Sequence, residues 1–457
     1  MEHLGINIDI RNIPELDPGF IPLHRFNQAF LAGAKKPLGI AVERANGEMA
    51  AVETYIHGTA AMREADCYYV NRLVKTILWM KGGFRIYVRG DEGIYAYLKQ
   101  AYSAGGCQAF DWDYMAGIFE HPFEVVMTDT LPESKDAPKA IGGHLTGCRI
   151  GFDAGGSDRK VSAVIDGECD YSEEVIWFPK LNEDPDYHYE HILEAFKTAA
   201  SKMPRVDAIG VSSAGDYIDN EPRVASLFIK VPRENWDKVK TIYTRAAAAI
   251  GDVPLVVAND GDVSALAGAI GLDAGKLMGL AMGTSEAVGY VDADKNVLGW
   301  INELAFAPVD LQAGDMQDEW STDYGVGCKY FSQDAVIKLC PAAGIELPEE
   351  LSLAEKLKFV QKLMEADDPR AQAIFETIGA YFAYTMVLYS QFYDLDYMML
   401  MGRVMSGKGG DTILKVCNDI LAEEYPALAA KCKVTLPDEK MRRVGQAVAA
   451  ASLPKIQ

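Results

Sequence analysis

The sequence predicts an α/β protein with two related lobes and an additional α/β segment at its N-terminus. From about residue 148 onward, apolar strand-like runs alternate with helical patterns, which is typical of a mostly parallel sheet flanked by helices. Two similar strand-turn-strand patterns, RIGFDAGGSDRKVSAVIDG and LMGLAMGTSEAVGYVDADKNVLG, lie about 130 residues apart and indicate two related lobes. The first 146 residues follow a separate pattern.

The bulk composition limits the function classes. The 457 residues are 49% apolar and 24% charged, which predicts two or three packed domains. A net charge of −22 argues against nucleic-acid binding, because that affinity depends on clustered Lys and Arg. No segment approaches the roughly 18 apolar residues of a membrane helix, and the N-terminus lacks a signal pattern. We therefore expect a cytoplasmic protein with a small-molecule substrate and neither nucleic-acid nor membrane partners.

The N-terminal segment is predicted element by element. PLGIAVERANGEMAAVETYI predicts a β-hairpin with Asn46 and Gly47 at its turn. READCYYVNRLVKTILWM predicts a helix, FRIYVRG a strand, DEGIYAYLKQAYS a helix and FEVVMT a strand. LPESKDAPKAIGGHLTG is polar and punctuated by Pro and Gly, which predicts a linker, so we place the accessory domain at residues 1–146.

The two lobes follow. Helical patterns around HILEAFKTAASKM, WDKVKTIYTRAAAAIG and GDVSALAGAIG alternate with strands at VDAIGVSSAG and PLVVAND. Near the C-terminus, AIFETIGAYFAYTMVLYSQFY predicts a long helix whose aromatic residues pack in the core, followed by the buried strand YMMLMG and the helix DTILKVCNDILAEEY. We place the first lobe at 147–270 and 438–457, and the second at 271–437.

Four turns carry residues suited to chemistry. In the turn 153–157, DAGGS, the glycines let backbone N–H groups approach a phosphate, and Asp153 could hold a metal ion through a water. The turn 283–285, GTS, has the same design. The run 259–262, NDGD, follows a strand, where a carboxylate can accept a hydroxyl proton during phosphoryl transfer. The run 402–410, GRVMSGKGG, begins a helix that could hold an adenosine or an α-phosphate.

Each turn alone also fits a plain β-turn, a helix N-cap or a flexible connection. Their joint order, strand-DxGG-hairpin, strand-NDxD-helix, strand-GTS-hairpin and strand-GxxxSGxGG-helix, resembles the motif series of the ROK family within the actin-like ATPase and sugar kinase superfamily, from about Ile150 to the C-terminus. The resemblance implies two ribonuclease H-like lobes, ATP and Mg²⁺ as cofactors, and a homodimer.

The resemblance also implies roles for individual residues. Asp260 corresponds to the general base, and Asp153 to the carboxylate on the Mg²⁺ side, acting directly or through a water. Substrate binding is assigned to Asn259, to Glu303 in NELAFAPVD, and to Ser213 and Gly215 at the end of VDAIGVSSAG. ATP binding is assigned to Gly155, Gly156, Ser157, Gly283, Thr284, Ser285, Gly402, Ser406 and Gly407.

The sequence departs from the family pattern mainly on the acceptor side. Phe306 stands where the family has a histidine, and Tyr330 where it has a further sugar-contacting glutamate. Only Cys328 matches the family's zinc segment, so we expect no structural zinc. Arg403 replaces a glycine, and Glu286 in the second phosphate loop could repel phosphates.

Because of these departures, three functions stay open. The first is ATP-dependent phosphorylation of a hydroxyl on a sugar or a sugar-like molecule. The second is a catalytically inactive ROK-like regulatory protein that binds a sugar or a nucleotide. The third is a nucleotide-driven protein that binds a partner through its N-terminal segment. The identity of the acceptor follows from none of these motifs.

Overall fold

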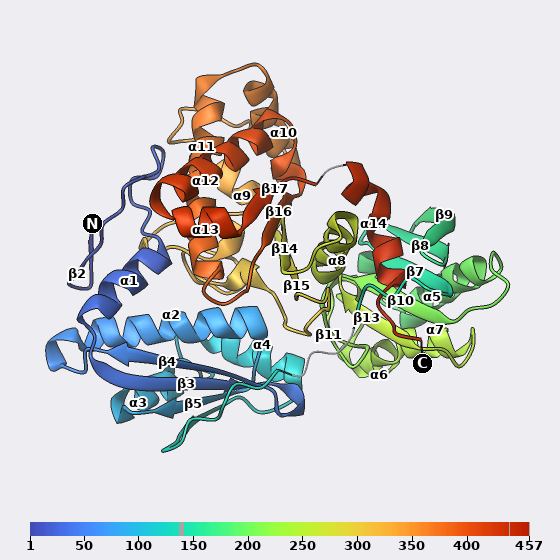
Figure 1. Ribbon diagram of the computed structural model, residues 1–457, viewed down its shortest axis with the longest axis horizontal. Helices are drawn as coiled ribbons and strands as arrows, with labels where there is room; N and C mark the ends of the chain where they lie inside the picture. Colours follow the sequence, from blue (N-terminus) through green and yellow to red (C-terminus); the bar gives the residue numbers. More distant parts are fainter. Residues whose placement is uncertain (137–140, 438, 457) are drawn as a thin grey trace. The chain divides into compact units, whose positions relative to one another are not determined.

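The computed structural model describes residues 1–136, 141–437 and 439–456. The chain forms two compact units. Unit 1 comprises Met1–Asp136, Leu280–Val288 and Trp300–Leu436, and unit 2 comprises Ala137–Gly279, Gly289–Gly299 and Pro437–Gln457. Both units mix helices and strands (Figure 1), which confirms the predicted α/β class. Across the described ranges, no helix is long and apolar enough to cross a lipid bilayer.

Unit 2 is built on a five-stranded sheet in the order β13-β10-β7-β8-β9. Strands β7, β10 and β13 pair in parallel, whereas β8 runs antiparallel to both of its neighbours. The sheet is therefore a three-stranded antiparallel meander, β7 to β9, extended by two parallel strands. The strands are β7 (Cys148–Ala154), β8 (Asp158–Ile165), β9 (Glu168–Ile176), β10 (Ala208–Ser213) and β13 (Leu255–Asn259).

Helices cover both faces of this sheet. Phe152 and Phe196 belong to a core that the sheet shares with α5 and α7. On the opposite face, α14 packs so closely that a Cβ on Gly151 would lie 1.7 Å from the Ala447 carbonyl oxygen. The helices are α5 (Pro185–Ala200), α6 (Trp236–Lys240), α7 (Ile242–Ala248), α8 (Asp260–Leu272) and α14 (Glu439–Ala451), and a small hairpin is formed by β11 (Asp216–Ile218) and β12 (Glu221–Val224).

The N-terminal segment contains a four-stranded sheet in the order β4-β3-β5-β6, with α2 packed against β3 and β4 (Figure 1). The predicted hairpin is confirmed, and Asn46 at its turn has a positive φ of 60°. The elements are β1 (Glu2–His3), β2 (Ile6–Asn7), α1 (Leu23–Gly33), β3 (Lys36–Glu43), β4 (Met49–Ile56), α2 (Arg63–Lys81), β5 (Arg85–Arg89), α3 (Glu92–Ala101), α4 (Ala109–Phe119) and β6 (Glu124–Met127).

A second four-stranded sheet has the order β15-β14-β16-β17. Long helices accompany it, and the predicted core helix is α11, which is buried along most of its length. The elements are β14 (Leu277–Met282), β15 (Glu286–Val291), α9 (Gln333–Leu339), α10 (Leu353–Glu365), α11 (Pro369–Tyr389), β16 (Tyr397–Met401), α12 (Lys408–Glu424), α13 (Pro426–Lys431) and β17 (Lys433–Thr435).

The N-terminal segment and the helices of the second lobe share one interior within unit 1. The ring of Phe20 lies 4.6 Å from that of Tyr381 on α11, measured between centroids. The Tyr381 hydroxyl donates to Asp17 Oδ2 at 2.5 Å, and the Asn12 amide donates to Glu424 Oε1 on α12 at 2.7 Å. The predicted boundaries at residues 146, 270 and 437 stay a prediction, and residues 137–140 of the predicted linker and residue 438 lie outside the described residues.

Candidate functional site

In unit 2, the carboxyl ends of β7, β10 and β13 meet at one edge of the sheet. Asp153 on β7 is the register partner of Ser212 on β10, and Ser213 is the partner of Asn259 on β13. The Ser212 hydroxyl donates to Asp153 Oδ1 at 2.9 Å. Burial raises the pKa of Asp153 to about 6, with Ser212 opposing this shift and the nearby Asp260 carboxylate adding to it. Asp153 thus titrates close to neutral pH.

The predicted phosphate loop is the hairpin turn between β7 and β8. Trp177 holds two of its carbonyl groups. The indole N–H of Trp177 donates to Gly155 O at 2.7 Å, and its backbone N–H donates to Ser157 O at 3.2 Å. Gly156 and Ser157 are exposed, and their N–H groups donate to no acceptor in the described part of the chain. Two free N–H groups on an exposed turn suit an anion such as a phosphate.

Asp260 begins helix α8 at this same edge. Asn259 is the N-cap, since its Oδ1 accepts from Gly261 N at 2.7 Å. Of the three polar residues in the run 259–262, it is thus the amide Asn259, and neither Asp260 nor Asp262, that caps the helix. Burial raises the pKa of Asp260, while the Gly261 N–H and the charge of Lys180 lower it. Because Asn259 caps the helix, the Asp260 carboxylate is not needed as the cap.

Ser213 and Gly215 shape the loop beside Asn259. Ser213 is fully buried, and its hydroxyl accepts from the Tyr217 phenol at 2.6 Å and from the Tyr243 phenol at 3.0 Å. Gly215 has a φ of 125°, and its carbonyl accepts from Asn259 Nδ2 at 2.9 Å. These contacts position the loop, and direct substrate contact by either residue stays a prediction.

Unit 1 carries the second predicted phosphate turn, between β14 and β15. Thr284 and Ser285 are exposed, and the Gly283 carbonyl accepts from Gln333 N at the start of α9 at 2.9 Å. Gly402, at the end of β16, has a φ of 95°, and a Cβ there would lie 2.4 Å from the Met282 carbonyl oxygen. The glycine is thus required for the close approach that brings the two motifs together.

The predicted adenosine site lies at the N-terminus of α12. Ser406 and Gly407 are exposed, and Gly407 caps the helix with a φ of 68°. A carboxylate already lies at this helix end, because Glu365 Oε1 of α10 accepts from Lys408 N at 2.9 Å. A nucleotide phosphate at this position would have to displace Glu365, so the helix end does not fit an α-phosphate as it stands.

Glu286 does not have the effect expected from its place in the second loop. Its side chain is buried. Its Oε2 lies against Gly327 and has no hydrogen-bond partner among the described residues, whereas its Oε1 accepts from the Tyr389 hydroxyl at 3.4 Å. Burial raises the pKa of Glu286 to about 8, although a hydrogen bond from Tyr389 opposes the shift. At neutral pH this carboxyl is mostly protonated. The expected repulsion of phosphates is therefore wrong, because the group points into the core and carries little charge.

The loop that carries Glu303 packs against the N-terminal segment. The Asn302 N–H donates to the carbonyl of Met80, at the end of α2, at 3.1 Å. The Phe306 ring lies 4.6 Å from the Trp79 ring and 5.3 Å from the Phe110 ring, between centroids. An apolar ring stands where the family has histidine because this position faces aromatic side chains of α2 and α4. Glu303 itself is half-buried.

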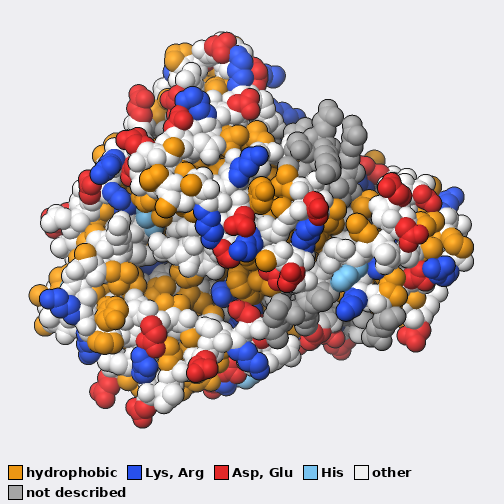
Figure 2. All heavy atoms as spheres, viewed as in Figure 1, with side chains coloured by type: hydrophobic (Ala, Val, Ile, Leu, Met, Phe, Trp, Pro, Cys, Tyr) orange, Lys and Arg blue, Asp and Glu red, His pale blue; other side chains and the backbone are white. Residues whose placement is uncertain are grey.

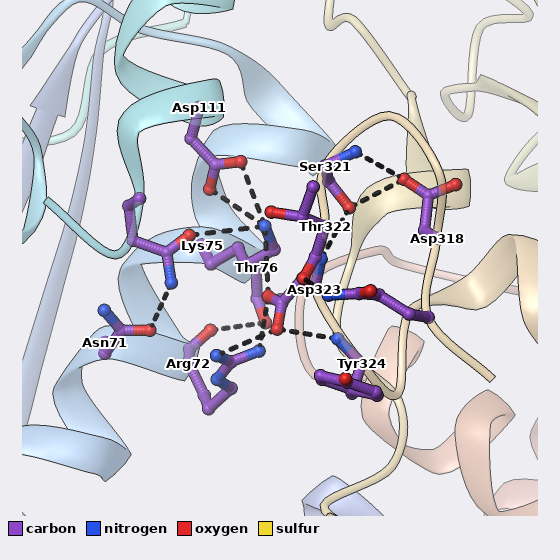
Figure 3. A network of polar contacts seen from close by, with 12 residues as sticks. Asn71, Arg72, Lys75, Thr76, Asp111, Asp318, Ser321, Thr322, Asp323 and Tyr324 are labelled. Atoms are coloured by element: carbon purple, nitrogen blue, oxygen red, sulfur yellow. Dashed lines mark hydrogen bonds and ion pairs between the residues drawn. The ribbon is translucent and has the colours of Figure 1, made fainter. Parts of the chain in front are cut away.

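A buried ionic network extends this contact (Figure 3), and sequence reasoning missed it. Lys75 Nζ on α2 lies 2.9 Å from Asp111 Oδ1 on α4 and 3.3 Å from Asp323 Oδ2. Arg72 binds Asp323 with both terminal nitrogens, at 2.8 and 3.4 Å. Burial would raise the pKa of Asp323, but the charges of Arg72 and Lys75 lower it to about 2. The network ties the loop around residue 323 to the N-terminal helices.

A group of three carboxylates, Asp17, Asp310 and Asp315, also lies in unit 1, and no other such group occurs among the residues that the structure describes. The Tyr330 hydroxyl lies within hydrogen-bond distance of carboxylate oxygens of both Asp310 and Asp315, and the Lys338 ammonium donates to Asp315 Oδ2. These partners give the group a structural role. Tyr330, which replaces a family glutamate, is thus fully buried and committed to this cluster.

No protein-family model matches this chain, and no curated protein matches it in sequence. Among solved structures, the ROK hexokinase from Thermus thermophilus has a TM-score of 0.52 at 17% identity, covering 67% of this chain and 97% of that one. A ROK family transcriptional regulator, a homologue of the E. coli MLC protein, has a TM-score of 0.51 at 16% identity, covering 68% of this chain and 79% of that one. The chain therefore shares the fold of these ROK proteins.

Proposed function

We propose that the protein transfers a phosphoryl group from ATP to a hydroxyl of a sugar or a sugar-like molecule. The observation that carries this proposal is the sheet edge of unit 2. There, Asp153 and Asp260 interact electrostatically beside a turn with two free N–H groups. A base for the hydroxyl, a carboxylate for a cation and donors for phosphate oxygens are the parts that phosphoryl transfer needs.

Asp260 is the residue that we assign as general base. Its pKa is raised by burial, which makes the carboxylate a better proton acceptor near neutral pH. It is held by its own helix, since its Oδ1 accepts from Gly261 N at 3.0 Å. In the reaction, Asp260 would accept the proton of the acceptor hydroxyl, whose oxygen forms the new bond to the γ-phosphorus while the bond from that phosphorus to the ADP oxygen breaks and ADP leaves.

The phosphate side of the site fits a magnesium nucleotide. Bound ATP would supply the phosphoryl group, and Asp153 is the residue that we assign to Mg²⁺, directly or through a water. Gly156 and Ser157 would donate their free N–H groups to phosphate oxygens. In unit 1, the exposed turn at Thr284 and Ser285 would bind phosphate in the same way. We assign acceptor binding to Asn259 and Glu303, without naming the acceptor.

The test is Asp260→Asn, which keeps the shape of the side chain and removes the base. A thermal-shift panel of MgATP with sugars and polyols first identifies an acceptor for the wild type. We expect Asp260→Asn to lower acceptor-dependent ADP release by about 10²- to 10⁴-fold, with ATP affinity changed only a few-fold. Asp273→Asn, an exposed position at the other end of α8, is the control and should be fully active. Full activity of Asp260→Asn would refute the base assignment, and the absence of any ATP response would refute the function.

A second candidate is a regulatory protein that binds ATP or a sugar without turnover. Two observations favour it. Glu365 occupies the helix end at the start of α12 where a nucleotide phosphate would bind, and Phe306 packs against Trp79 where the family resemblance has a histidine. On the face shown in Figure 2, Lys and Arg lie interspersed with Asp and Glu, so that face offers no basic stripe to DNA. Stabilisation by ATP with no acceptor-dependent ADP release would support this candidate.

A further inference from the structure

The segment after β9 brings a basic side chain to the phosphate turn. Lys180 lies in the short 3-10 helix Pro179–Leu181. Its Cε is 3.0 Å, and its Nζ 3.2 Å, from where a Cβ on Gly156 would stand. Its charge also acts on the Asp260 carboxylate. The ammonium group therefore lies over the turn, on the side of the assigned base.

The backbone that leads into Lys180 is held at two points. Trp177, three residues earlier, holds the turn through its bonds to Gly155 and Ser157. The carbonyl of Pro179 accepts from Nε2 of His188, a fully buried side chain on α5, at 2.9 Å. Lys180 is thus an exposed, long side chain on a backbone that is held beside the turn.

No hydrogen bond or ion pair holds the Lys180 ammonium within the described residues. Lys160 on the neighbouring strand β8, by contrast, forms an ion pair with Glu174 at 3.4 Å. In a chain with a net charge of −22, a lysine without a carboxylate partner beside free N–H groups is suited to a ligand that brings its own negative charge.

We infer that Lys180 is a further catalytic residue of this site, which binds oxygens of the phosphoryl group that is transferred. The inference rests on the proposed function and extends it. The chemistry is that of a point charge, which stabilises the negative charge on the phosphate oxygens as the bond to the nucleotide breaks. Lys180 also offsets the repulsion between those oxygens and the carboxylates of Asp153 and Asp260.

The test compares nucleotide binding by titration calorimetry for the wild type, Lys180→Met, Lys180→Arg and Lys197→Met. Lys197 is an exposed lysine of the same unit, twelve residues after the start of α5, or about 18 Å along the helix. We expect Lys180→Met to bind MgATP about tenfold to a hundredfold more weakly, with a smaller loss for MgADP. Lys180→Arg should retain much of the MgATP affinity, and Lys197→Met should bind as the wild type does.

Two results would overturn the inference alone. One is wild-type MgATP affinity in Lys180→Met, and the other is an equal loss of MgATP and MgADP affinity, because a contact to the transferred group distinguishes the two nucleotides. If the wild type itself fails to bind MgATP, the proposed function falls and the inference with it. Circular dichroism and the melting temperature of each variant show whether the fold is retained, and Lys180→Arg separates loss of charge from loss of side-chain packing.

Discussion

The buried pair of Lys75 and Asp111 allows a quantitative prediction. Both side chains are about 1% exposed, and the ammonium lies 2.9 and 3.1 Å from the two carboxylate oxygens. Lys75→Met removes the charge but keeps most of the side-chain volume. Asp111 then stays buried without its cation, whereas Asp323 keeps its two bonds from Arg72. Breaking a buried pair from one side costs about 3–5 kcal/mol, and we expect a loss of this size.

The assay is urea unfolding followed by circular dichroism, with Lys35→Met as the control. Lys35 is exposed, so its loss should change the free energy of unfolding by no more than about 0.5 kcal/mol. The double variant Lys75→Met/Asp111→Leu removes both charges and should recover most of the loss. Because burial raises the pKa of Asp111, the single variant can take up a proton there, so its deficit should be smaller at pH 5 than at pH 8.

Two outcomes would refute this reasoning. If Lys75→Met is as stable as the Lys35→Met control, the Lys75–Asp111 pair in Figure 3 contributes nothing to the free energy of unfolding. If the double variant is as unstable as the single variant, the loss comes from packing around Lys75 and not from an unpaired carboxylate.

Three further predictions concern single positions. Folding raises the pKa of Glu286 from 4.5 to about 8, so the contribution of this carboxyl to wild-type stability is fully present below pH 4.5 and is lost as the pH rises through 8. Between pH 5 and 8, the free energy of unfolding of Glu286→Gln, measured with urea, should therefore rise by roughly 4 kcal/mol relative to that of the wild type. Gly402→Ala should lower the melting temperature, because its Cβ would meet the Met282 carbonyl oxygen at positive φ, while Gly117→Ala on α4, with open space around it, should leave the melting temperature unchanged or raise it. Phe306→His should lower the free energy of unfolding by about 1–3 kcal/mol, because it places a polar ring among aromatic side chains. Phe306→Leu is the apolar control, and scanning calorimetry of both variants shows whether the loss comes from polarity or from the missing ring contacts.

The sequence predicts the fold well where local patterns decide it. The hairpin 36–56, the helix α2 and the core helix α11 all lie where their apolar periodicity and turn residues indicate. The turn 153–157 also lies between two strands, and Asp260 begins a helix directly after a strand. These features depend on residues within a few positions of one another.

The parts of the site that depend on distant residues could not be predicted in this way. Lys180 meets Gly156 from a segment 24 residues later, and its local sequence, WFPKLN, carries no motif that indicates a phosphate contact. Glu365 caps a helix that begins 43 residues after it, and Arg72 binds a carboxylate 251 residues away. Glu286 was expected to be a charged loop residue, because the residues next to it in sequence do not indicate that it is buried against Gly327. Such pairings arise only when the chain packs.

The position of α14 has a consequence for how the chain can be made. This helix covers one face of the β7 and β10 strands, where Gly151 and Gly210 leave room for its backbone. The ribosome synthesises that helix almost 300 residues after β7, so the part of the sheet that α14 covers in the folded protein emerges from the exit tunnel still exposed. Unit 2 therefore cannot complete its core during translation until α14 has emerged, and the nascent sheet needs protection from aggregation until then.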